Sequence, residues 1–220
     1  MTDPMSDPGV RVVELQVADA PEAWRNAGFA VVEDVCEVGS VRLRLVGREA
    51  GRGVVGWGLS GVDVTEVDGV PVVGFDTSSL VPHDRSPSGS GYSTNGTVAI
   101  DHLVLMTPDL DRTLDALAGI GLEPRRHRDG ELGGNAVRQV FYRLGEVVLE
   151  VVGDPQAHGE GPASIWGITF TVADIDATAA LLGDGVGRVK DAVQPGRRIT
   201  TLRGRDLGIS TAVAFISERA

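Results

Sequence analysis

The sequence predicts an α+β fold built from repeated β-α-β-β-β modules. Short apolar runs with strand character alternate with single amphipathic helices along most of the 220 residues. A strand that runs into an aspartate at the start of a helix recurs at 17–19, 106–111 and 171–176. Such a junction is common wherever helix N–H groups need an acceptor, but three copies at similar spacing favour an internal repeat.

The first module is expected over residues 9–73, beginning with a strand at 10–17. Asp19 suits the N-cap of a short helix that has Pro21 in its first turn and ends at Gly28. Three runs rich in valine then indicate three strands, at 29–37, 41–46 and 54–59.

Two more modules are expected after residues 74–97, a linker in which serine, glycine and proline replace the apolar pattern. Residues 98–152 contain a strand, a helix, a second strand and a hairpin that turns at Gly145. Residues 163–218 repeat that order of elements. The polar segment 1–8 is expected to be a disordered terminus.

Composition narrows the classes of function. The net charge of −11 argues against nucleic acid or an anionic membrane surface as the main partner. No run approaches the roughly 18 apolar residues of a membrane span, and the start lacks a signal-peptide pattern, so a cytoplasmic protein is expected. Cys36 is the single cysteine, which excludes an intramolecular disulfide and a cysteine-rich zinc site.

Three segments resemble the vicinal oxygen chelate superfamily, which has the glyoxalase and bleomycin-resistance-like fold. They are IDHLVLMTPDLDRTLDAL (100–117), VRQVFYRLGEVVLEVVG (137–153) and WGITFTVADIDATAALL (166–182). The segment QPGRRITTLRG (194–204) is also similar to one in glyoxalase-like proteins of unassigned activity. Over 10–73 only the order of elements matches. The resemblance implies that paired modules curl into an open, half-barrel mixed sheet around a cavity that takes a small molecule.

The resemblance also implies two candidate metal ligands, His102 on a first strand and Glu150 on a fourth strand. They would suit a divalent ion such as Zn²⁺, Ni²⁺, Mn²⁺ or Fe²⁺. Strand alternation places His102 on one face with Val104 and Met106. A carboxylate in the apolar run around Glu150 is costly unless it is paired, hydrogen-bonded or bound to a cation.

The other modules lack this pair, so the metal site would be incomplete. Gly167 occupies the position of His102 in the third module, whose last strand has no acid. In the first module that position falls near Val12, two residues from Glu14, and the run at 54–59, taken as the fourth strand, has no acid either. Two protein ligands hold a metal poorly, because tight sites generally offer three or more.

Several polar and aromatic residues near this pair are candidates for ligand contacts. Glu150 could instead accept hydrogen bonds from His102 or from an arginine. Either Tyr142 or Phe141 should face the cavity, and Trp166 could cover it or lie on the surface. The predicted ligand-binding set is His102, Glu150, Tyr142, Arg138 and Trp166. The arginines considered as partners of Glu150 are Arg125, Arg126, Arg138 and Arg143.

The densest basic cluster is near the C-terminus. It suits either an anionic ligand or a solvated strand and turn that balances an acidic protein. Its members are Arg197, Arg198, Arg203 and Arg205.

Two functions are compatible with these patterns. The first is binding of a small molecule in the cavity between modules, without a complete metal site. The alternative is a metal-dependent lyase, isomerase or dioxygenase that uses His102 and Glu150, and no catalytic residue is assigned. The linker allows the first module to pair with the second, or the second with the third. One module is then unpaired with an uncovered sheet, which predicts a homodimer.

Overall fold

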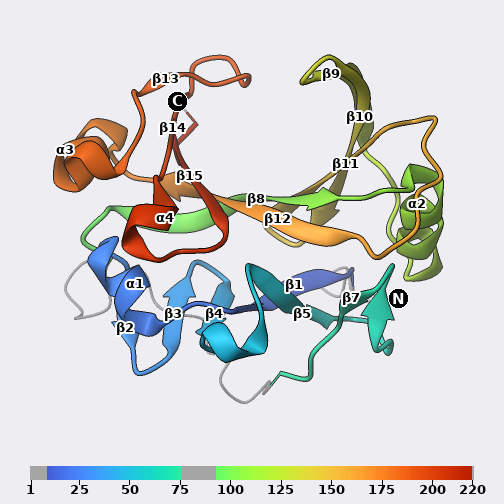
Figure 1. Cartoon of the computed structure of the whole chain (residues 1–220), viewed down its shortest axis with the longest axis horizontal. Helices are drawn as coiled ribbons and strands as arrows, with labels where there is room; N and C mark the ends of the chain where they lie inside the picture. The colour runs from blue at the N-terminus through green and yellow to red at the C-terminus, as the bar shows by residue number, and fades with distance from the viewer. Residues whose placement is uncertain (1–8, 76–92, 220) are drawn as a thin grey trace, which may run out of the picture.

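The computed structural model describes residues 9–75 and 93–219. It confirms the α+β class and the curled, open half-barrel sheet (Figure 1). The predicted disordered terminus at 1–8 and most of the predicted linker at 74–97 lie outside the described residues. No helix in the described part of the chain is long and apolar enough to span a membrane.

One eight-stranded sheet contains the second and third modules, in the order β13-β14-β15-β12-β8-β11-β10-β9. The second module supplies β8 (Thr97–Met106), α2 (Leu110–Gly119), β9 (Arg126–Leu132), β10 (Asn135–Leu144) and β11 (Val147–Gly153). The third supplies β12 (Ser164–Val172), α3 (Ile175–Leu182), η3 (Gly183–Gly185), β13 (Lys190–Asp191), β14 (Arg198–Thr201), α4 (Gly204–Leu207) and β15 (Ala212–Ser217). The first strands of the two modules, β8 and β12, pair antiparallel at the centre.

The second and third modules therefore pair, and their outer strands rise on either side of β8 and β12 (Figure 1). Their helices begin as the sequence predicts. The side chain of Asp109 accepts a hydrogen bond from the backbone N–H of Arg112, and that of Asp174 accepts from Asp176 and Ala177. Each aspartate satisfies N–H groups that the first helical turn leaves without partners.

The first module forms a separate five-stranded sheet in the order β2-β3-β4-β1-β5. Its elements are β1 (Arg11–Val17), α1 (Pro21–Asn26), β2 (Val31–Val32), β3 (Val35–Val38), β4 (Val41–Leu45), η1 (Arg48–Ala50) and β5 (Val54–Ser60). A small hairpin follows, made of β6 (Glu66–Val67) and β7 (Val70–Pro71).

Two expectations about the strands of this module are wrong. The run at 29–37 is two strands, because the chain turns at Glu33, whose φ is 53°. The fourth strand is therefore β4, which lies parallel to β1, and the run at 54–59 belongs to a fifth strand. That strand, β5, pairs antiparallel with β1, as β12 pairs with β8.

Asp19 does not cap α1 as expected. The N-cap is Ala20, without a side-chain hydrogen bond. Asp19 is fully buried, and its carboxylate accepts hydrogen bonds from Nε1 of Trp24 at 3.1 Å and from the backbone N–H of Ser210 at 2.9 Å. This aspartate thus connects the first module to the third.

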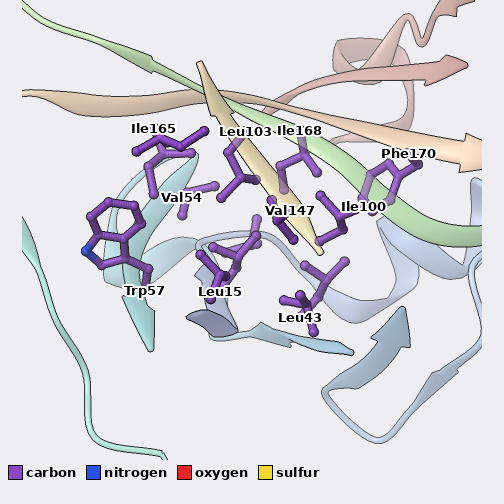
Figure 2. Packing of buried hydrophobic residues seen from close by; sticks show 14 of the residues in the cluster. Leu15, Leu43, Val54, Trp57, Ile100, Leu103, Val147, Ile165, Ile168 and Phe170 are labelled. Carbon is purple, nitrogen blue, oxygen red and sulfur yellow. The ribbon is translucent and has the colours of Figure 1, made fainter. Parts of the chain in front are cut away.

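The apolar faces of the two sheets pack against each other (Figure 2). Leu15 and Leu43 come from the first sheet, and Leu103, Ile168 and Phe170 from the second, and all are buried. The apolar face of the first module is therefore covered within one chain. The homodimer stays a prediction, but its reason, an uncovered sheet face, does not apply to this face.

Candidate functional site

The candidate site lies on the face of the eight-stranded sheet that turns away from the first module. Along β8, Leu103 and Leu105 are fully buried against the core, and His102 and Val104 alternate with them and are half-buried. Glu150 on β11 is also half-buried, beside the fully buried Leu149 and Val151. We call the face that carries His102 and Glu150 the concave face.

His102 and Glu150 are diagonal neighbours on this face. Val148 is the Cα partner of His102 in the parallel β8–β11 ladder, and Glu150 is the partner of Val104. Diagonal positions on adjacent strands are within reach of long side chains. The structure therefore brings together the two residues that the resemblance selected, although no hydrogen bond joins them among the described contacts.

His102 is held by Asp101, the residue before it. The β8–β12 register steps from Thr169 opposite His102 to Phe170 opposite Ile100, so Asp101 is an extra residue at a β-bulge. Nδ1 of His102 lies 2.7 Å from Oδ2 of Asp101, and Nη1 of Arg197 donates to Oδ1 at 2.5 Å.

Burial alone would raise the pKa of Asp101, but the hydrogen bonds from His102 and Arg197 outweigh it and hold that pKa below its usual value. Arg197 is only 3% exposed and also donates to the carbonyl oxygen of Ser217. Its neighbour Arg198 pairs with Asp176. Arg197 therefore acts inside the fold, and the predicted basic cluster is not a single anion site.

Glu150 has a partner that sequence reasoning missed. Nε2 of Gln139 donates to Oε1 of Glu150. The predicted partner Arg138 instead donates to Asp129 on β9 at 2.6 Å, and so lies away from this carboxylate. Strand alternation could have identified Gln139, because it lies two residues from Phe141, the Cα partner of Glu150.

The residues present do not fit a three-ligand metal site in one chain. The Nδ1 atom of His102 is engaged by Asp101, so Nε2 is its remaining nitrogen, and Glu150 supplies a carboxylate. Across the ladder, Thr169 and Gly167 stand opposite His102 and Val104 and add no usual ligand. Within residues 9–75 and 93–219, no group of three or more His, Cys, Asp or Glu side chains could hold an ion.

A hollow of about 330 Å³ adjoins His102 where the two modules meet. The second module contributes most of its wall, and the third contributes Gln194 and Arg219. Its lining residues are Arg125, Arg126, Phe141, Tyr142, Arg143, Val148, Gln194 and Arg219. The hollow lies beside His102, because its lining residue Val148 is the Cα partner of His102 in the β8–β11 ladder.

The aromatic candidates differ in exposure. Phe141 is half-buried, and the Arg126 guanidinium lies 4.4 Å from its ring centroid. Tyr142 also lines the hollow but is only 2% exposed, and burial raises its pKa to about 12. Trp166 is 60% exposed and lies outside the hollow. Phe141 is therefore the most available aromatic surface at the hollow.

The comparisons with known proteins agree with this architecture. Residues 101–201 match the family model described as Glyoxalase/Bleomycin resistance protein/Dioxygenase superfamily. This segment covers β8 to β14 and includes His102 and Glu150. The match therefore lies within the paired second and third modules and covers slightly less than half of the chain. A comparison with curated proteins found no match in sequence.

Several solved structures share the fold over the whole chain. A mutant of 4-hydroxymandelate synthase from Streptomyces coelicolor is 14% identical, with a TM-score of 0.61 over 97% of this chain and 94% of that one. A xylose isomerase-like TIM barrel/4-hydroxyphenylpyruvate dioxygenase fusion protein is 15% identical. Its TM-score is 0.63 over 100% of this chain and 51% of that protein. An extradiol ring-cleaving dioxygenase from B. fuscum is 12% identical, with a TM-score of 0.52 over 100% of this chain and 75% of that one. At these identities the likeness shows the fold alone.

Proposed function

We propose that this protein binds a small molecule on the concave face, in the hollow where the second and third modules meet. One observation carries the proposal: residues from both modules line a single hollow beside His102. Ligand sites are usually concave, with apolar walls and a few polar groups that fix orientation. Phe141 and Val148 provide the apolar wall, and the polar groups are arginines and Gln194.

The polar groups next to the hollow support a binding role. His102 and Glu150 are half-buried, and each has one identified side-chain partner. Holding such groups at a sheet surface is costly, because polar atoms removed from water need hydrogen bonds. The remaining atoms of His102 and Glu150 would contact a ligand that extends from the hollow.

The test is a fragment screen by ligand-observed NMR, with the full chain and two variants. Phe141→Ala removes the aromatic wall, and Val148→Trp fills the hollow. We expect fragments that bind the wild type to lose most of their signal in both variants. Val32→Ala is the control, because Val32 is 70% exposed on β2, in the other sheet. Fragments that bind both site variants as well as they bind the control would refute the proposal, as would a screen without hits.

A second candidate function is metal-dependent chemistry with His102 and Glu150 as ligands. One observation favours it: histidines that bind metals commonly donate their other ring N–H to a carboxylate, as His102 can to Asp101. A bound divalent ion would polarise oxygen atoms of a substrate. His102 and Glu150 are only two protein ligands, which weighs against a metal-dependent function. A further ligand would have to come from a second copy of the chain or from the substrate.

Metal content of the purified protein separates the two functions. The measurement is made after supplementation with Zn²⁺, Ni²⁺, Mn²⁺ and Fe²⁺, and light scattering on the same samples reports the oligomeric state. A stoichiometric ion that is lost in both His102→Ala and Glu150→Gln, and kept in the control His158→Ala, would support the metal-dependent function. Wild-type protein without metal would leave the binding function as the account of the site.

A further inference from the structure

We propose that the ligand of the hollow carries an anionic oxygen group, a carboxylate or a phosphate, attached to a flat apolar body. This inference rests on the proposed function and adds the chemical class of the ligand. It is carried by the arginines around the hollow, which are Arg125, Arg126, Arg143 and Arg219. They come from the start of β9, from β10 and from the C-terminal segment, so separate parts of the chain converge on one place.

These four arginines have no carboxylate partner among the described residues, although the chain has a net charge of −11. Seven arginines elsewhere in the described part of the chain do form ion pairs with carboxylates, some of them on the surface. The paired ones are Arg25, Arg42, Arg44, Arg112, Arg138, Arg197 and Arg198. A positive cluster in an acidic protein leaves charge uncompensated, and an anion in the hollow would compensate it.

The geometry of the arginines suits an oxygen anion. A guanidinium offers several N–H donors in a planar fork that matches the oxygen atoms of a carboxylate or phosphate. Arg126 lies over the ring of Phe141, which limits the positions its long side chain can adopt. A side chain that is already oriented loses less entropy when it binds a ligand.

The apolar part of the ligand would lie against the floor of the hollow. Phe141 and Val148 form this floor, and Tyr142 closes it from the buried side. A flat body can stack on an aromatic ring, which contributes more than its buried area alone. A ligand placed in this way extends toward His102, because Val148 lies beside that residue in the β8–β11 ladder.

The experiment measures binding of three matched probes by isothermal titration calorimetry. Naphthoate carries a carboxylate, naphthyl phosphate carries a phosphate, and naphthamide has the same apolar body without charge. We expect at least one anionic probe to bind the wild type about tenfold or more tightly than naphthamide, as expected for charge-assisted hydrogen bonds. The preferred anion identifies which of the two groups the site takes. Its affinity should fall with rising salt.

Variants assign the preference to the hollow. Arg126→Gln and Arg219→Gln should each weaken the preferred anion about tenfold and leave naphthamide nearly unchanged. Both side chains are exposed, so the fold does not depend on their burial. Arg52→Gln removes the same charge from an exposed position between η1 and β5 and is the matched control. It should leave all three affinities unchanged.

The outcomes separate this inference from the proposed function. If naphthamide binds as tightly as both anions, and Phe141→Ala weakens all three, the hollow binds small molecules but the inference about charge is wrong. If Arg52→Gln weakens the anions as much as Arg126→Gln does, the preference reflects overall charge and the inference is also wrong. If no probe binds at millimolar concentration although the fragment screen gives hits in the hollow, the inference is wrong and the proposed function stands.

Discussion

Nδ1 of His102 lies 2.7 Å from Oδ2 of Asp101, its immediate neighbour on β8. Adjacent residues of a regular strand point to opposite faces, so this contact requires the bulge at Asp101. The other carboxylate oxygen is held by Arg197 of the third module. A residue of one module thus positions, through Asp101, the candidate ligand-binding histidine of the other. When Nδ1 carries the proton, Nε2 is left as an acceptor for a ligand.

Asp101→Asn should destabilise the protein by about 3 kcal/mol, because it leaves the buried Arg197 guanidinium without its anion. Urea unfolding at neutral pH measures this loss. Asp184→Asn is the control, since Asp184 is exposed in η3 and forms no ion pair among the described residues. Equal stability of the two variants would show that the Asp101–Arg197 pair contributes nothing.

The stability difference between wild type and Asp101→Asn should depend on pH. The pKa of Asp101 is lowered in the folded state. Its contribution to the free energy of unfolding is therefore fully present above the ordinary carboxyl pKa of about 3.9. This contribution is lost as the pH falls through the lower pKa that Asp101 has in the folded state. The difference in unfolding free energy should therefore be constant between about pH 7 and pH 5 and shrink below about pH 4. Urea titrations at each pH test this, and a difference that grows on acidification would contradict it.

Asp19→Ala should destabilise the protein by about 3 kcal/mol, since Nε1 of Trp24 and the backbone N–H of Ser210 would lose their acceptor. Thermal and urea unfolding measure the loss. The exposed Asp63 of the same module provides the control variant Asp63→Ala. The prediction is contradicted if Asp19→Ala unfolds at the same denaturant concentration as the control. Water would then replace the carboxylate at little cost in stability.

Cys36 should be unreactive in the native protein. It is fully buried, and burial, together with the neighbouring Glu37, raises the pKa of its thiol to about 12. Because the thiolate is the reactive form, a thiol reagent such as DTNB should label it only when the first module opens. Rapid labelling in native buffer, as complete as in denaturant, would show that β3 is not packed as described.

Much of the fold could be predicted from the sequence, because its signals are local. Asp109 and Asp174 lie immediately before apolar periodic segments, and both cap helices as expected. The first module was harder to predict. The turn at Glu33 lacks a glycine or proline, so a run of valines looked like one strand when it is two. Asp19 has the sequence context of a cap, but its partner Ser210 is distant in the chain.

The candidate site was predicted in part. His102 and Glu150 came from the resemblance, and the structure places them on one face. Asp101 was missed because a β-bulge depends on register. Gln139 was missed although strand alternation puts it on the same face as Phe141. Three arginines of the hollow, Arg125, Arg126 and Arg143, were considered from the sequence, but as partners of Glu150. Arg219 joins the others only when the third module folds against the second.

The most direct test of this account is NMR mapping of the strongest ligand from the fragment screen on isotope-labelled protein. We expect the largest chemical-shift changes at residues 125–126, 141–143, 148, 194 and 219, with smaller changes at His102. A separate hollow is lined by Lys190 and Arg198 of the third module. Changes concentrated there, or on the first module, would contradict the claim that the ligand binds between the paired modules.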